Sequence, residues 1–515
     1  MKNLKVMKNI SNIILVNCFI LSLIALTACD DRLERPAENR TFSESIDYSK
    51  TSDMNLPLIG AYQAFQSRGW EQFPLIGVRG DDVNAGVLGD QPDFMETDFF
   101  RYNKDFWMYN SLWQTMYSDI IAGIAAQNQI DQYAEQAAGG HSADQYKAEI
   151  DVLNAFLLFH ISRVWGAVFI PETADPSDLL VADVSSKEEV MQYISDKMAA
   201  AAPLLPDMRP NERPDLPGGV TRYTALAVKA LADLELENYQ AVADAAGAII
   251  NSGLFKLYPD FYQLFKKPGE LSDETLLEFQ YSDFGQGSGT QIVYETAFFG
   301  PQSWIPKVGN INGGWGFWEP SLKWIKFMLD RGERDRLETS VLFTPRGIAE
   351  IRKDPDYTDL PDWVSNVTPS GDIINDYTRA MFASGKHYLP SEQITSGRTA
   401  WANGMNIRGI RYAEVLLMYA EAVTRGASGS AGSADEAVNL VRSRAGLSSL
   451  SGVTTAQVLD EKFAELAMEW GTRYYDLLRT ENYDELSYDG RTFTLDLKYL
   501  PYPQAQVDIL PGLSR

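Results

Sequence analysis

The chain has 515 residues, with 45 Lys and Arg against 70 Asp and Glu, which gives a formal net charge of −25 at pH 7. So acidic a chain lacks the cationic surface that phosphate binding requires, which excludes a general nucleic-acid-binding function. Only two cysteines are present, so a disulfide framework is excluded and stability must come from a hydrophobic core.

The first 28 residues have the pattern of a secretory signal. Three lysines precede an apolar run over residues 13–26, and small residues then lead into Cys29. This order of positive charge, apolar run and small residues is typical of a cleaved export signal. The run is shorter than the about 20 apolar residues that a membrane-spanning helix needs. The junction before Cys29 resembles the lipobox of bacterial lipoproteins, which predicts cleavage after residue 28 and acylation of the Cys29 thiol.

Residues 29–50 are expected to form the lipidated cysteine and a flexible tether, because they are polar and show no periodicity. Acyl chains gain about 0.8 kcal/mol per buried CH₂, so they would hold a soluble domain on a membrane without a spanning helix. Asp30 and Asp31 resemble the acidic tag that sends some lipoproteins to the outer cell face. We therefore expect a surface-exposed protein that meets the membrane through its lipid anchor alone.

From residue 51 onward the sequence predicts mainly α-helix. Apolar residues recur at i, i+3, i+4 and i+7 over residues 227–234 and again over 239–246, and Gly253 follows as a helix cap. The pair has the size of a tetratricopeptide-type helical hairpin, about 34 residues. Similar apolar stripes occupy residues 148–159, 413–420 and 434–441. We expect one domain over 51–515, with parts at about 51–260 and 261–515, built on a tetratricopeptide-like scaffold with long irregular loop insertions.

Several segments resemble the motifs of the SusD/RagB family of nutrient-binding outer-membrane lipoproteins, and they follow one another in the family's order. Trp113, Tyr117 and Asn128 fit the family's early helices, although Trp470 stands where a smaller or polar residue is expected. The motif segments are residues 164–171, 411–422, 439–447, 465–479 and 500–503. The resemblance implies a protein that captures an oligosaccharide, or alternatively a peptide. It also implies a partner, a TonB-dependent transporter of the outer membrane, to which the ligand is delivered.

The candidate ligand-binding residues are aromatic and lie in glycine-rich, irregular stretches. A sugar ring presents a C–H face that packs on an aromatic plane, while its hydroxyls need polar partners. Trp315 and Trp318 are the expected platforms, on a loop whose glycines let the backbone approach a ligand closely. The further candidates are Trp304, Tyr281, Trp70, Arg79, Asp82 and Trp107.

Two other functions remain open at this stage. One is a lipid-anchored helical-repeat adaptor that binds only protein, and the other is a surface glycoside hydrolase, which needs two carboxylates across a sugar bond. The acids of the family motifs, such as Glu465 and Glu469, look instead like framework ion pairs along their helix with Arg473. The three histidines show no metal-ligand spacing. We therefore predict neither enzyme activity nor a metal or cofactor.

Overall fold

The structure is a computed structural model that describes residues 46–67, 73–85, 92–137, 142–282, 294–400 and 403–514. The chain separates into two units, residues 1–50 and residues 51–515, and the second unit contains every element discussed below. Cys29 and Trp70 lie outside the described residues, so the predicted lipidation site and one predicted platform are not placed. Among the described residues, no helix combines the length and apolar character that crossing a bilayer requires.

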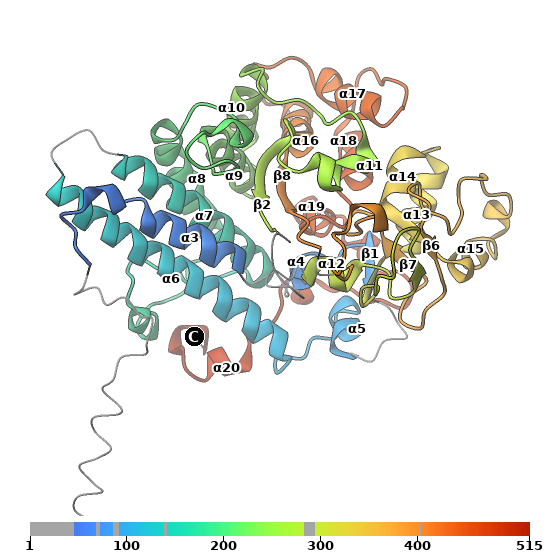
Figure 1. Cartoon of the computed structure of the whole chain (residues 1–515), viewed down its shortest axis with the longest axis horizontal. Coiled ribbons are helices and arrows are strands. Elements are labelled where there is room, and N and C mark those ends of the chain that lie inside the picture. The colour runs from blue at the N-terminus through green and yellow to red at the C-terminus, as the bar shows by residue number, and fades with distance from the viewer. Residues whose placement is uncertain are drawn as a thin grey trace, which may run out of the picture. The chain divides into compact units, whose positions relative to one another are not determined.

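The first half of the second unit is a layer of helices in which sequence neighbours are also neighbours in space (Figure 1). Alanines fill the contact between consecutive helices: Ala227 and Ala230 on one helix and Ala243 and Ala246 on the next are fully buried. Such small side chains let the helix axes approach closely. The helices are α3 (Leu56–Ser67), α6 (Trp107–Gln136), α7 (Ala143–Trp165), α8 (Lys187–Ala201), α9 (Arg222–Glu235) and α10 (Tyr239–Asn251).

The chain leaves this layer after Asn251 and returns to it at Tyr412. There α16 (Tyr412–Thr424) packs on α10, and α17 (Ala434–Arg444) and α18 (Thr455–Glu465) pack on α16. The helix α19 (Thr472–Arg479) then contacts α18. The helical layer therefore continues across a large insertion in the sequence, and we call residues 252–411 the inserted region.

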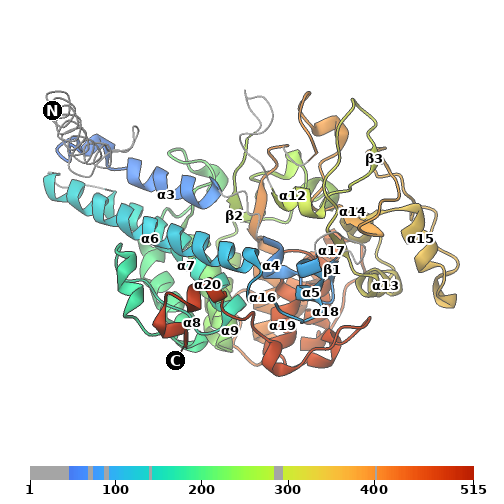
Figure 2. The same cartoon turned by 90° about the horizontal axis from the view of Figure 1, so that it is seen from below.

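The inserted region is built from short helices and two-stranded antiparallel sheets, which occupy the side of the unit opposite α8, α9 and α19 in Figure 2. The strands pair as β1–β4, β2–β8, β3–β6 and β5–β7, with β1 contributed by an earlier segment. The strands are β1 (Val83–Ala85), β2 (Thr275–Phe279), β3 (Trp304–Ile305), β4 (Trp318–Pro320), β5 (Val341–Phe343), β6 (Ile373–Ile374), β7 (Phe382–Ser384) and β8 (Ile407–Arg411). The remaining short helices are α4 (Phe73–Gly77), α5 (Pro92–Asp98), α11 (Phe261–Leu264), α12 (Tyr294–Phe299), α13 (Leu322–Asp330), α14 (Asp335–Ser340), α15 (Pro345–Ile351) and α20 (Gln504–Val507).

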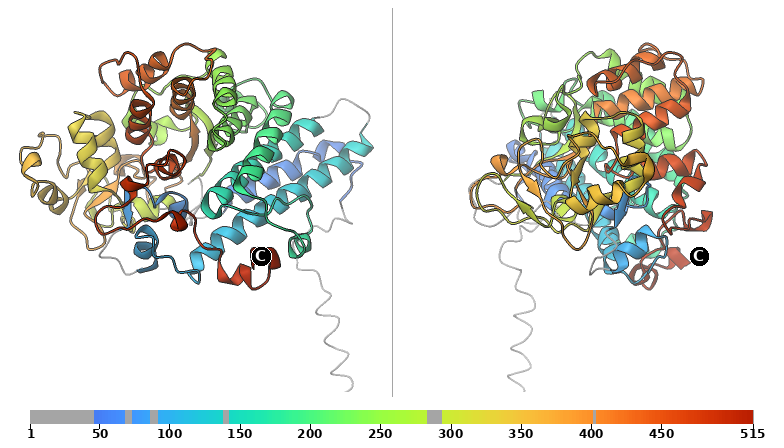
Figure 3. Two further views of the ribbon diagram at one scale, coloured as in Figure 1. Left: turned by 180° about the vertical axis from the view of Figure 1, so that it is seen from behind. Right: turned by 90° about the vertical axis from the view of Figure 1, so that its right-hand side faces the viewer.

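The C-terminal segment closes against the end of α7, far away in sequence (Figure 3). Leu500 N–H donates to Val164 O at 2.9 Å, the Trp165 indole N–H donates to Pro501 O at 3.2 Å, and the Tyr502 hydroxyl donates to Ala167 O at 2.6 Å. A single large cluster of buried apolar side chains runs through the helical layer and much of the inserted region. A second, smaller cluster surrounds Trp304.

Buried ion pairs join the two parts of the unit. The Arg411 guanidinium lies 2.7 Å from a Glu274 carboxylate oxygen, 3.0 Å from one of Glu465 and 2.8 Å from one of Glu469. Burial opposes ionisation of Glu465, but the guanidiniums of Arg444, Arg411 and Arg336 outweigh it and lower the pKa of this carboxyl to about 2. The Glu465 carboxylate is therefore an ionised framework group.

The helical expectations are confirmed: the stripes at 148–159, 227–246 and 413–441 lie in α7, α9, α10, α16 and α17, and Gly253 has a positive φ of 65°. The predicted pairing along one helix is wrong. Glu465 ends α18, while Arg473 lies in α19 and binds Asp81 at 2.7 Å instead of Glu469. The helix breaks between them because Met468, Trp470 and Gly471 all have positive φ.

Candidate ligand-binding site

A row of aromatic rings connects the start of α6 to α12 and to the loop that precedes β4. We call this row the aromatic ridge. The centroids of successive rings lie 5.2–6.1 Å apart, mostly in tilted or edge-to-face arrangements that aromatic quadrupoles favour. In order along the row, the members are Trp107, Phe106, Phe94, Phe298, Trp315 and Tyr294.

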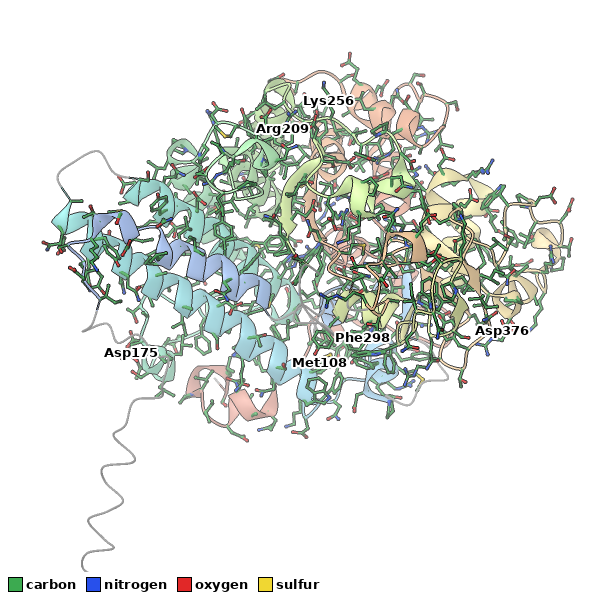
Figure 4. The ribbon with its side chains drawn as sticks, in the orientation of Figure 1. Met108, Asp175, Arg209, Lys256, Phe298 and Asp376 are labelled. Carbon is green, nitrogen blue, oxygen red and sulfur yellow. The ribbon has the colours of Figure 1, made fainter. Side chains whose placement is uncertain are left out.

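The ridge is closed in its middle and open at its ends. Phe94, Phe106 and Phe298 are buried, whereas Trp107 is 52% exposed and Trp315 and Tyr294 are half-buried. Figure 4 labels Phe298 and also Met108, the buried neighbour of Trp107 in the chain. The buried rings fix the positions of two indoles that still present surface to solvent.

Backbone hydrogen bonds hold the Trp315 loop along the end of α12. Trp315 N–H donates to Ala297 O at 2.6 Å, and Phe317 N–H donates to Phe298 O at 2.8 Å. Gly316 has a φ of +62°, and a Cβ on it would lie 2.6 Å from the Tyr377 ring. A Cβ on Gly313 would lie 2.4 Å from the carbonyl oxygen of Pro301. These two glycines therefore allow the loop to pack closely on its own chain.

Polar groups surround the Trp315 end of the ridge. The Arg379 guanidinium donates to Trp315 O at 2.8 Å and lies 4.0 Å from the centre of the Phe317 ring. The exposed side chain of Gln302 starts beside Gly316, because the two Cβ positions are 3.3 Å apart. Asp376, labelled in Figure 4, is exposed, but its carboxylate accepts the Arg346 N–H at 2.8 Å at the start of α15 and is not placed beside Trp315. The Gln302 amide is suited to the rim of a sugar site, where hydroxyls need donors and acceptors.

Two predicted platforms belong to the core instead. Trp318 has no exposed surface and packs edge-on against Phe94 at 5.2 Å, because its strand β4 is covered on both faces. Trp304 is 8% exposed, and its indole N–H donates to Ile311 O at 2.9 Å within the smaller apolar cluster. A buried indole has no face to offer a ligand, so the assignment of both as platforms is corrected.

Arg79 and Asp82 are also structural. The Arg79 guanidinium lies 4.4 Å from the Tyr474 ring centre and donates to Lys498 O at 3.2 Å. An Asp82 carboxylate oxygen accepts the Met468 N–H at 2.7 Å. Burial raises the pKa of Asp82 to about 6. Both side chains are about 1% exposed, so neither forms the edge of a ligand site.

Of the remaining candidates, Trp107 is the first ring of the ridge and Trp315 is the last but one, before Tyr294. Tyr281 follows β2, and its N–H donates to the Asn406 side-chain oxygen at 2.8 Å. The prediction omitted Tyr294, Phe298, Gln302 and Arg379. For Tyr294 and Phe298 a signal existed, since both belong to a short aromatic run just before the glycines. Gln302 and Arg379 carry no such pattern.

One constellation resembles catalytic machinery. The Ser384 hydroxyl lies 2.7 Å from His387 Nδ1, and His387 Nε2 lies 2.9 Å from a Glu295 carboxylate oxygen. All three side chains are buried, and Ser384 has no exposed surface, so no substrate carbonyl can reach the hydroxyl in this structure. Within the described ranges, no group of three or more His, Cys, Asp or Glu side chains is arranged to hold a metal ion.

Comparisons with known proteins agree on one family. The sequence model of the SusD family matches residues 274–515. The SusD-like protein P2 of Formosa agariphila is 26% identical over 495 residues, which cover 90% of this chain and 89% of that protein.

Solved structures share the fold. Surface glycan-binding protein A from Bacteroides thetaiotaomicron, solved with laminarihexaose, has a TM-score of 0.70 at 22% identity, covering 90% of this chain and 98% of that one. A laminarin-binding SusD-like protein has a TM-score of 0.72 at 20% identity, covering 89% and 97% respectively. These sequence identities are too low to assign a ligand to this chain. The structural similarity confirms the predicted helical, tetratricopeptide-like fold.

Proposed function

We propose that this chain is a member of the SusD family, whose model matches residues 274–515, and that it binds an oligosaccharide on the aromatic ridge and leaves it chemically unchanged. The observation that carries the proposal is the pair of solvent-open indoles, Trp107 and Trp315, held at the ends of a buried row of rings. Preorganised platforms lose little conformational entropy on binding, which favours affinity. Gln302 supplies hydrogen-bonding groups beside the Trp315 loop.

The first ligand class to test is a neutral β-glucan. Two proteins of similar fold are named for laminarihexaose or laminarin, and the acidic surface of this chain, with its charge of −25, disfavours polyanionic glycans. A peptide ligand remains the alternative, and short neutral peptides belong in the same screen.

The test compares three tryptophan variants by calorimetry against laminarihexaose. Loss of one stacking ring costs on the order of 1–3 kcal/mol, so Trp315→Ala and Trp107→Ala should each weaken binding roughly tenfold or more. Trp363→Ala is the matched control, because Trp363 is also half-buried but lies outside the ridge. Unchanged affinity in both ridge variants would refute the proposed site.

We also propose that the protein releases its ligand chemically intact. Ser384, whose hydroxyl lines up with His387 and Glu295, is fully buried, and Glu465 is held ionised by arginines, which removes it as a general acid. Prolonged incubation with laminarihexaose should therefore produce no new reducing ends. Stoichiometric or faster release would establish a hydrolase.

Anchoring and delivery complete the proposed function. Acylation of Cys29 would hold the domain at the outer membrane, where it would pass its ligand to a TonB-dependent transporter. Cys29→Ala should move the protein from the membrane to the soluble fraction, while Cys18→Ala, within the same leader, should leave it membrane-bound. Purification of the tagged wild-type protein in mild detergent should recover the transporter, and its absence from every such preparation would contradict the delivery step.

A further inference from the structure

The helical layer contains two adjoining cavities, of about 250 and 350 Å³, well away from the aromatic ridge. They share Ile170, Pro171, Glu172 and Tyr193, so the two cavities meet along this strip of chain and this aromatic ring. The first cavity opens between α6, α7 and α8, which lie side by side in Figure 1 and in the left view of Figure 3. Its α6 residues begin at Ile120, which is about 20 Å along the helix from Trp107 at 1.5 Å per residue.

Local sequence explains why the cavities form. The chain leaves α7 at Gly166, which has a positive φ of 80°, and runs past the helices until Val168 pairs with Ser185. On the opposite side, a Cβ on Gly123 would lie 2.5 Å from the Asn154 side chain, so α6 and α7 approach closely there. Residues 170–172 follow this exit from α7 and line both cavities.

The first cavity combines an apolar floor with polar side chains that have unused hydrogen-bonding capacity. Gln127 donates to Asp151 at 2.8 Å and is engaged. In contrast, the Tyr193 hydroxyl and the Glu172 carboxylate form no hydrogen bond with the described part of the chain, and the Lys197 ammonium only faces the Tyr193 ring at 5.7 Å. The floor consists of Ile120, Ile124, Ala155, Leu158, Ile170 and Pro171.

The second cavity determines which charge the ligand can carry. Its lining includes the carboxylates of Glu172, Asp175, Asp178 and Asp183, and no Lys or Arg. Asp175 is labelled in Figure 4 at the edge of the unit. These carboxylates repel an anionic ligand, and Asp175 and Asp178 already accept from the Ser177 N–H at 2.9 Å and from the Thr173 hydroxyl at 2.5 Å. Burial raises the pKa of the Tyr193 phenol, and the carboxylates of Asp151 and Glu172 raise it further, which places both carboxylates near the shared ring.

We infer that this two-lobed cavity is a second binding site for a neutral oligosaccharide, with Tyr193 and the apolar floor packing on sugar C–H faces and Glu172 accepting sugar hydroxyls. The inference rests on the proposed function and extends it from one site to two. Each lobe is close to the lower end of the 300–1,000 Å³ range of ligand pockets, so each accommodates a short stretch of glycan.

The test titrates laminarihexaose into the full mature chain and into two sets of variants of it, one at the ridge and one at the cavity. The wild-type protein should bind two molecules per chain, and Trp315→Ala with Trp107→Ala should retain one. Tyr193→Ala should weaken the retained site at least tenfold, and Glu172→Lys should also weaken it, while Gln192→Ala, an exposed position one residue from Tyr193 on α8, should not. Unfolding curves identify any variant that fails to fold, and Tyr193→Phe then serves as the milder replacement, with a loss of about threefold expected.

The outcomes separate the two proposals. If the wild-type protein binds one ligand per chain and the ridge variants bind none, the second site is overturned and the ridge proposal stands. Binding that the ridge variants leave unchanged but Tyr193→Ala removes supports the cavity and refutes the ridge. If the cavity binds a glucosamine hexamer more tightly than laminarihexaose, and Glu172→Lys abolishes that binding, the assignment of a neutral ligand is overturned.

Discussion

The helical layer and the inserted region both bury their apolar side chains, but they do so with different backbone structures. In the layer, periodic alanines and leucines bury one face of each helix, as in α9 and α10. In the inserted region, short strands and short helices carry large aromatic side chains that are buried just as completely, such as Trp318 in β4 and Trp324 in α13. The comparison shows that irregular backbone here does not mean exposed or loosely packed side chains.

The largest effect is expected where the two regions meet. Arg411→Ala leaves the carboxylates of Glu274, Glu465 and Glu469 buried without their shared guanidinium. Breaking a buried ion pair in this way costs on the order of 3–5 kcal/mol of unfolding free energy. Urea unfolding provides the measurement, with Arg334→Ala as the control, because the Arg334–Glu338 pair is exposed and contributes about 0–1 kcal/mol. A loss below 1 kcal/mol for Arg411→Ala would mean that the regions are not joined through this group.

Two tryptophan substitutions compare the regions directly. Trp165, in α7, and Trp318, in β4, are both almost completely buried, so each change to Ala should lower the unfolding free energy by about 3–5 kcal/mol. Trp315→Ala should cost only about 1 kcal/mol, because it removes two aromatic contacts from a half-buried ring. If Trp318→Ala cost as little as Trp315→Ala, the inserted region would be less rigid than its burial indicates.

The pH dependence of stability separates buried carboxyls by their partners. Burial raises the pKa of Asp82 to about 6 and that of Glu319 to about 7. Backbone N–H groups that donate to these carboxylates oppose the rise without cancelling it. The native state holds these protons more tightly than the unfolded chain, so stability should rise as pH falls from 8 to 5. Arginines and a lysine lower the pKa of Glu465 and Asp476 to about 2 despite burial, so stability should fall again below about pH 4.

Of the free energies of unfolding measured with denaturant at pH 3, 5 and 8, the one at pH 5 should therefore be the largest. Each carboxyl with a raised pKa should contribute on the order of 2 kcal/mol to the difference between pH 5 and pH 8. Glu319→Gln keeps an oxygen acceptor for the Met381 and Phe382 N–H groups but removes the charge. It should make the fall between pH 5 and 8 shallower. An unchanged slope would contradict the assignment of that slope to Glu319.

The smallest effect concerns two glycines with similar backbones. Gly253, after α10, has a φ of +65° and open space around its Cβ position, so Gly253→Ala should cost about 1 kcal/mol through backbone strain alone. Gly316 has a φ of +62° but faces the Tyr377 ring at 2.6 Å, so Gly316→Ala should cost about 1 kcal/mol more and weaken glycan binding through Trp315. Equal losses in the two variants would show that the Trp315 loop can move away from Tyr377.

The sequence predicted the layer well because helical periodicity reports directly which face is buried. The stripe at residues 227–234 lies in α9 with its apolar side inward. The aromatic site was predicted only in part, because a tryptophan beside glycines is consistent with either a platform or a core residue. Trp315 and Trp318 differ by three positions, yet strand pairing of β4 with β1 buries one while the α12 contact leaves the other half-open. Such long-range pairing has no local signal.

The closure of residues 500–502 on α7 has a consequence for how the chain is made. Trp165 and Pro501 are 336 positions apart, and Tyr502 reaches back 335 positions to Ala167. A chain emerging in order from the ribosome cannot complete the end of α7 until nearly all of it has been synthesised. Contacts so distant in sequence also slow folding. The end of α7 therefore keeps its backbone carbonyl at Ala167 and its indole at Trp165 without these partners until synthesis is almost complete.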